Sequence, residues 1–182
     1  MAFNINDFSS ALKFGGARNS LFQVQITNPI NGAADAIVPF MVKGAEIPAS
    51  TVGTIEVPYF GRQIKLPGNR TYAEWTPTII NDEDFAIRNA LEQWSNSINS
   101  FQGNVTTAGG SAPTLYKSNA QVTQYSKTGE VLRVYNFVGL YPSEVSTIEL
   151  AWDNEGIEEY TATFQYDYWE VAGGNTGDAG GI

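Results

Sequence analysis

The chain has 182 residues and a net charge of −9, with 42% apolar and 13% aromatic residues and neither histidine nor cysteine. This length suits one domain that buries an ordinary apolar core. The missing His and Cys exclude disulfides, thiolate metal ligands and the usual Ser-His-Asp and Cys-His groups, so the composition favours a protein that is not an enzyme and needs no cofactor.

The negative charge is concentrated in the C-terminal quarter. Residues 134–182 contain nine acidic and no basic side chains, whereas residues 1–133 contain ten of each. A surface built from that quarter would repel nucleic-acid phosphates and anionic lipids. Because the N-terminus has no leader pattern and the longest apolar run is only 36–42, we expect no membrane span and a chain made in a cytoplasm.

The first sixteen residues predict an arm with a short helix. Ile5, Phe8 and Leu12 share one face at helical spacing, Asn6 or Asp7 caps the start, and Gly15–Gly16 ends the helix. So short a helix is marginal by itself and needs a surface on which to dock.

Alternating apolar and polar residues predict several strands in the first half of the chain. A turn at Tyr59–Gly61 forms the tip of a hairpin, and Pro39 favours an edge position for the strand that contains it. The expected strands cover residues 21–27, 37–43, 51–58 with 61–66 as the hairpin arms, and 70–80.

One convincing helix follows, with Asn81 or Asp82 as its cap. Its apolar stripe recurs at helical spacing and is expected to pack on a sheet rather than in a partner's groove. The stripe consists of Ile87, Leu91, Trp94 and Ile98. Residues 99–118, with Gly109–Gly110 in the middle, read as a long polar loop.

The last third predicts four more strands, over residues 120–126, 131–138, 148–152 and 160–170. The Gly-rich residues 173–182 read as a flexible tail. We therefore expect a single domain over residues 1–172, mainly β, with a sandwich-like or barrel-like sheet and one flanking helix.

No group of residues marks a reaction. Asp153, Glu155, Glu158 and Glu159 form an acidic cluster, but its spacing does not match a calcium loop, and a solvated turn is the simpler interpretation. A carbohydrate-binding β-sandwich and a carboxylate glycosidase stay as alternatives. The first strand has few charges to guard its edge, which favours assembly with further copies of the chain.

Two blocks of sequence resemble the tail tube proteins of contractile-tailed, myovirus-type bacteriophages. The first runs from Gly68 through Arg70–Glu83 to Trp94. The second consists of 140–145, 150–153 and 164–170. Residues 19–24 fit the first strand of the family as well, so the resemblance spans about residues 1–170.

The resemblance implies a β-sandwich with a flanking helix that forms hexameric rings, in which the inner sheets join into one continuous barrel. Rings of that family stack into a tube inside a contractile sheath. The implied partners are a sheath protein, a tape-measure protein, a baseplate tube initiator and a tail terminator, and DNA passes through without specific binding. The protein would be part of the virion tail, assembled in the host cytoplasm. Tubes of type VI-like injection systems are related, so such a tube is the second interpretation.

Within that framework the sequence suggests two sets of residues. Part of the acidic charge of residues 134–182 is expected to face the channel, and the candidate lumen row is Thr161, Thr163, Gln165 and Asp167. Apolar groups outside the expected core are candidate contacts between subunits or rings, with local folding back as the alternative. The candidates are the apolar or aromatic Phe3, Ile5, Phe8, Leu12, Tyr59 and Phe60, together with Arg62 beside the hairpin tip.

Overall fold

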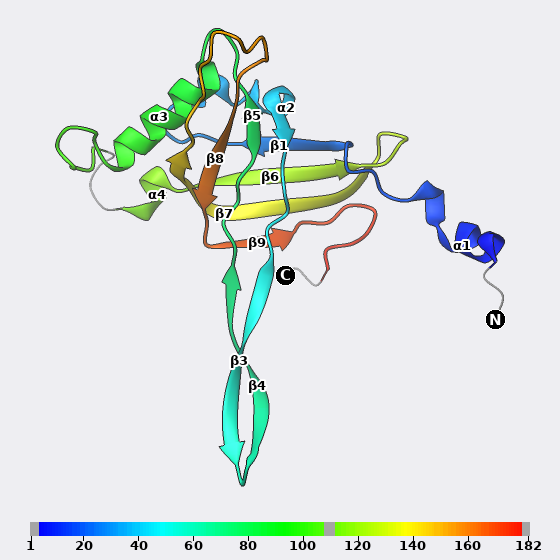
Figure 1. Cartoon of the computed structure of the whole chain (residues 1–182). Helices are drawn as coiled ribbons and strands as arrows, with labels where there is room; N and C mark the ends of the chain where they lie inside the picture. Colours follow the sequence, from blue (N-terminus) through cyan, green and yellow to red (C-terminus); the bar gives the residue numbers. More distant parts are fainter. Residues whose placement is uncertain (1–3, 108–111, 180–182) are drawn as a thin grey trace.

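A computed structural model describes residues 4–107 and 112–179. The predicted mainly β fold is confirmed: a curled, half-barrel sheet carries a few helices, and a separate two-stranded hairpin projects from it (Figure 1). The strands are β1 (Phe22–Ile26), β2 (Val42–Gly44), β3 (Ser50–Tyr59), β4 (Arg62–Tyr72), β5 (Thr78–Ile80), β6 (Ser118–Tyr125), β7 (Val131–Val145), β8 (Glu159–Gln165) and β9 (Tyr168–Val171). The helices are α1 (Ile5–Ala11), α2 (Val38–Met41), α3 (Ala86–Ile98) and α4 (Pro113–Tyr116), with 3₁₀ turns at Lys13–Gly15 and Gly32–Ala34.

The long strand β7 joins the two halves of the curled sheet. The sheet order is β1-β6-β7-β8-β5-β2, and β9 also pairs with β7. Residues before Gly139 pair with β6 and β9, and residues 141–145 pair with β8. Gly139 has a φ of +73° and a register shift lies beside it. This backbone geometry bends the sheet, so β8 and β5 run across β1, β6 and β9 (Figure 1).

The core fills the inner side of this bend. Trp75, Trp94, Phe137 and Phe164 are completely buried, and the ring of Trp75 stacks on Phe137 with centroids 4.6 Å apart. Helix α3 packs against β7. Its predicted stripe turns inward, since Ile87, Leu91 and Trp94 are buried and Ile98 packs partly buried against the core.

Two of the strands predicted in the first half of the chain are not found as predicted. Residues 38–41 form α2, not a strand, because Pro39 sits in the first helical turn, where its missing N–H costs nothing; only Val42–Gly44 is extended. The expected strand 70–80 is broken between β4 and β5. Pro77 cannot donate a ladder hydrogen bond, and Trp75 makes only an isolated bridge to Phe164.

Two expected strands near the C-terminus are also corrected. Residues 148–152 are not a strand but part of a long loop. The expected strand 160–170 is split at Tyr166–Asp167, where the chain leaves β8 and returns as β9 to pair with β7 (Figure 1). The segment 99–118 is not loop throughout, because it contains α4 and begins β6; its Gly109–Gly110 lies outside the described residues.

The helix caps also differ from expectation. Asn4, not Asn6 or Asp7, caps α1 by accepting a hydrogen bond from the Asn6 N–H. Helix α3 starts after Phe85, which has a φ of 53° and no side-chain cap, and Asp84 accepts from the Ala86 N–H at 3.0 Å. Of the helices in the described segments, none has the length and apolar character needed to cross a membrane.

Candidate assembly surfaces

The four-stranded part β1-β6-β7-β9 of the sheet has one apolar face, which is buried. Val24 of β1 lies opposite Val122 of β6, and that pair continues through Tyr135 to Val171 of β9. All but the half-buried Tyr135 are less than a tenth exposed. Because successive residues of a strand point to opposite faces, their neighbours must form the other face of this sheet.

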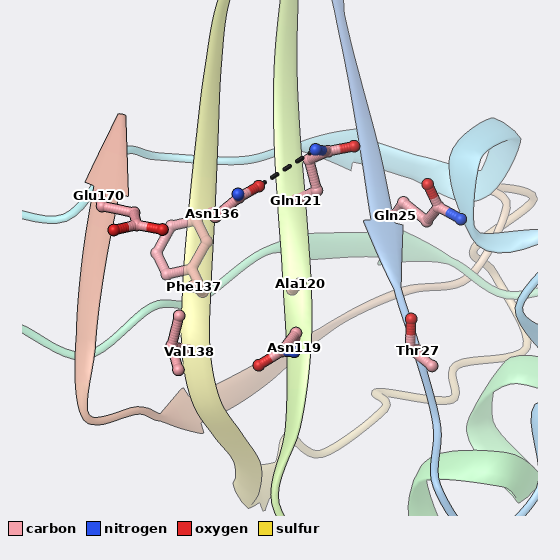
Figure 2. Close-up of a pocket in the computed structure, with 9 residues that line it drawn as sticks. All are labelled: Gln25, Thr27, Asn119, Ala120, Gln121, Asn136, Phe137, Val138 and Glu170. Atoms are coloured by element: carbon pink, nitrogen blue, oxygen red, sulfur yellow. Dashed lines mark hydrogen bonds between the residues drawn. The ribbon is translucent and has the colours of Figure 1, made fainter. Parts of the chain in front are cut away.

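That other face is lined by amides. The register aligns Gln25, Gln121, Asn136 and Glu170 in one row across all four strands (Figure 2). The Gln121 amide donates to Asn136 at 3.1 Å. Thr27, Asn119 and Val138 stand beside the row and help to line an open hollow of about 430 Å³. Of the residues that line this hollow in the described chain, Glu170 is the one with a charge.

Both edges of this four-stranded sheet are open. Within the described residues β1 pairs with β6 alone, and β9 pairs with β7 alone. Each edge therefore presents unpaired backbone groups, and no Lys, Asp, Glu or Pro within Phe22–Ile26 guards β1. Unguarded edges of this kind invite pairing with another strand.

The predicted lumen row lies on β8 and the turn after it, on the other side of the bend at Gly139 from the amide face. Thr161, Thr163 and Gln165 are half-buried on β8 and alternate with the buried Tyr160, Ala162 and Phe164. The Gln165 amide donates to Glu74 at 2.6 Å. Asp167 is exposed in the turn after β8 and forms an ion pair with Lys117 at 2.5 Å. The structure brings the row together as a surface but on the half of the sheet that β5 and β8 form.

The β3–β4 hairpin is amphipathic and exposed on all sides. The register pairs Ile55 with Leu66, Val57 with Ile64 and Tyr59 with Arg62, so these six side chains share one face. Glu56 faces Lys65 on the opposite, polar face. The five apolar members of the first face are each between 43% and 64% exposed.

The predicted contact residues lie at two projections. Tyr59, Phe60 and Arg62 form the tip of the hairpin, where Phe60 is 92% exposed. Helix α1 stands apart from the sheet (Figure 1) and buries none of its residues. Its Ile5 and Phe8 are mostly exposed, and Leu12 just after it is 44% exposed. Phe3 lies outside the described residues.

A sequence profile described as "Phage tail tube protein" matches residues 5–172. The chain belongs to this family. Tail tube protein gp19 of Enterobacteria phage T4 is 35% identical over 169 residues, which cover 91% of this chain and 99% of gp19.

Solved structures share the tail tube fold at lower identity. A chain of the PVC sheath–tube complex, from an extracellular contractile injection system in its extended state, superposes with a TM-score of 0.61 at 15% identity, covering 93% of this chain and 98% of that one. A chain of the PVC sheath/tube terminator has a TM-score of 0.64 at 16% identity, covering 86% of this chain and 96% of that one.

The sequence predictions missed the amide face of this tail tube protein. Its signal is visible as alternation, because Gln23, Gln25 and Thr27 interleave with the apolar residues of β1, and Asn119, Gln121 and Thr123 do so in β6. The missing information was that these two strands pair, although about ninety residues separate them in the chain.

Proposed function

We propose that the chain is the repeating structural subunit of a phage tail tube, without catalytic activity, and that six copies close into a ring. In this ring the four-stranded sheets β1-β6-β7-β9 pair edge to edge, β9 of one copy with β1 of the next, and form one barrel. The observation that carries the proposal is a sheet with two open edges, one buried face and one polar face. Closure into a barrel removes both edges.

The amide face of that sheet is the proposed channel wall. A barrel needs a face that tolerates water, and the row from Gln25 to Glu170 provides uncharged hydrogen-bonding groups with one carboxylate per subunit. A wall rich in Lys or Arg would bind phosphates and hold DNA, whereas amides and a carboxylate let DNA pass without specific binding. We propose this face in preference to the row Thr161–Asp167, since β7 bends at Gly139 and pairs with β8 only beyond that bend.

Membership of the tail tube family supports the remaining proposed partners. Rings would stack inside a contractile sheath, around a tape-measure protein, from a baseplate initiator to a tail terminator. The virion tail is the proposed location, after assembly in the host cytoplasm. The similarity to chains of a sheath–tube complex and of a sheath/tube terminator supports a shared fold. That same similarity favours the tube of a bacterial injection system as the second candidate function.

Electron microscopy of the purified chain over a concentration series, with light scattering for mass, tests the proposal. Rings or stacked hollow tubes with six copies per layer are the expected result. Because a tube subunit can wait for its initiator, the same series is run with tail baseplates as seeds. A chain that stays monomeric with and without seeds contradicts the proposed function, and glycan binding is then the next assay.

A charge reversal at Glu170 tests the channel wall. Tubes of Glu170→Lys should form normally and retain single-stranded DNA at low salt, with retention lost as salt rises, because each ring gains a girdle of cations. Glu83→Lys, at an exposed residue just before α3 on the core side of the sheet, carries the same change of charge and serves as the matched control. DNA retention measured by co-sedimentation, equal in the two variants, would contradict the placement of Glu170 in the channel.

A further inference from the structure

Two exposed surfaces of the chain complement each other in polarity and charge. The first is the apolar face of the β3–β4 hairpin, with the aromatic tip Tyr59–Phe60 and Arg62 across from Tyr59. An isolated two-stranded hairpin is marginal in water, and an apolar face of this size needs a cover. Within the described residues no element of the same chain supplies that cover.

The second surface consists of the loop between β7 and β8 and the first residue of β8, residues 147–159, and is named the acidic loop. Leu150, Trp152 and Ile157 are 76% exposed or more. The loop surrounds an open hollow of about 500 Å³. It contains five acidic and no basic residues, whereas hairpin residues 50–72 contain three cations and one acid.

Two of those five acids already have partners in the chain. Glu159 pairs with Lys43 at 2.6 Å, and Glu158 accepts from the Asn81 amide at 2.8 Å. Glu149, Asp153 and Glu155 are exposed. Within the described residues, no hydrogen-bond donor or cation lies within reach of their side chains. Three carboxylates beside three exposed apolar side chains make a surface for an apolar partner that carries positive charge.

The hairpin and the acidic loop project from opposite ends of the molecule. In Figure 1 the hairpin reaches the bottom of the view, while the chain between β7 and β8, drawn in orange and brown, forms the top. One chain therefore cannot join its own two surfaces. Two different surfaces at opposite ends form a heterologous contact, which repeats from copy to copy and builds rings or filaments.

We propose that the apolar hairpin face and tip of one copy dock on the acidic loop of a neighbouring copy. The aromatic tip enters the hollow beside Trp152, and Arg62 faces Asp153 and Glu155. A large aromatic group in a hollow is the arrangement that concentrates binding energy in protein interfaces, and the charges beside it favour the correct partner and orientation. This inference rests on the proposed function and deepens it, because it names the acceptor surface for the hairpin.

Cross-linking between two variants tests the contact directly. The chain has no cysteine, so Tyr59→Cys and Ala151→Cys each introduce one thiol. Purified singly, mixed and mildly oxidised, they should form a disulfide heterodimer about tenfold faster than a control pair of Thr128→Cys with Ala151→Cys, because docking raises the effective concentration of the thiols. Equal rates for the two pairs would overturn the proposal.

Charge reversal provides a second readout. Arg62→Glu should raise the critical concentration for assembly about tenfold, and Asp153→Lys with Glu155→Lys should restore it in the triple variant. Lys127→Glu, in the exposed turn between β6 and β7, is the matched control for charge. Assembly of Arg62→Glu at the same concentration as Lys127→Glu would overturn the proposed contact.

The results also separate this contact from the proposed function. Tubes of the unmodified chain without the preferential heterodimer overturn the docking contact alone. A preferential heterodimer from a chain that forms neither rings nor tubes, with or without baseplate seeds, supports the contact and contradicts the tube.

Discussion

The curled sheet and the β3–β4 hairpin are both built from strands with an apolar face, but only the sheet buries that face within the chain. In the sheet, one face is buried in a shared core that includes Trp75, Phe137 and residues of helix α3. In the hairpin, the corresponding apolar face is open to water along its whole length. The sheet is therefore folded within one chain, whereas the hairpin is complete only when another surface covers it. Substitutions in the core of the sheet should therefore reduce folding stability, whereas substitutions on the apolar face of the hairpin should reduce assembly.

The largest loss of stability is expected at Trp94. Its ring is fully buried against Phe164, with centroids 6.3 Å apart, and its indole N–H donates to the Tyr116 carbonyl at 2.7 Å. Trp94→Ala should lower the free energy of unfolding by about 3–5 kcal/mol, since a large cavity remains. Chemical denaturation measures this loss. An unchanged midpoint would contradict the packing of α3 on the sheet.

The next largest effect is expected at Gly139, where the sheet bends. Its φ is +73°, and an added Cβ would overlap the Asp167 carboxylate. Gly129 is the matched control, because its φ is +84° but an added Cβ would meet nothing within 4 Å. Gly139→Ala should cost clearly more than the roughly 1–2 kcal/mol of backbone strain expected for Gly129→Ala. Equal losses of stability by denaturation would show that the close approach of Asp167 adds no cost to that of the backbone strain.

Alkaline pH should destabilise the fold through Tyr166, which lies between β8 and β9. Burial raises the pKa of Tyr166 to about 12, and the neighbouring Tyr72 adds to the rise. The Tyr166 hydroxyl donates to the Ala73 carbonyl at 2.5 Å. Because the folded state favours the neutral phenol, its stabilising contribution is complete below pH 10 and is lost as pH rises from about 10 to 12. Thermal unfolding followed from pH 9 to 12 should show this decline, and a smaller one in Tyr166→Phe; identical declines would contradict it.

The smallest effect on folding, and a large one on assembly, is expected in the hairpin. Ile64→Ser should change the free energy of unfolding of the monomer by less than about 0.5 kcal/mol, because the side chain is 54% exposed. The same variant should fail to form tubes in sedimentation assays. Gln63→Ser, on the polar face of the hairpin, should assemble normally. A monomer destabilised by Ile64→Ser would show that the hairpin folds against its own chain.

Local patterns were sufficient for the elements whose signal is strong and contained within the element. The apolar stripe from Ile87 to Ile98 located α3, and the turn at Tyr59–Gly61 located the hairpin, although both of its strands are longer than expected. Proline positions were harder to interpret. Pro39 begins a helical turn and Pro77 interrupts a strand, and the choice between such roles depends on what packs around each proline.

Alternation and helical spacing in the chain were enough to predict a mainly β protein with one long helix and a buried stripe, and two blocks of residues carried its resemblance to tail tube proteins. Which strands are neighbours could be learned only from the folded chain. Because β1 pairs with β6 and β9 returns to pair with β7, these strands form a sheet with one polar face and two open edges. The bend at Gly139 separates that polar face from the row on β8. Alternation within a strand fixes which side chains share a face, but the partner strand is chosen by core packing between residues far apart in the chain, which no local pattern records.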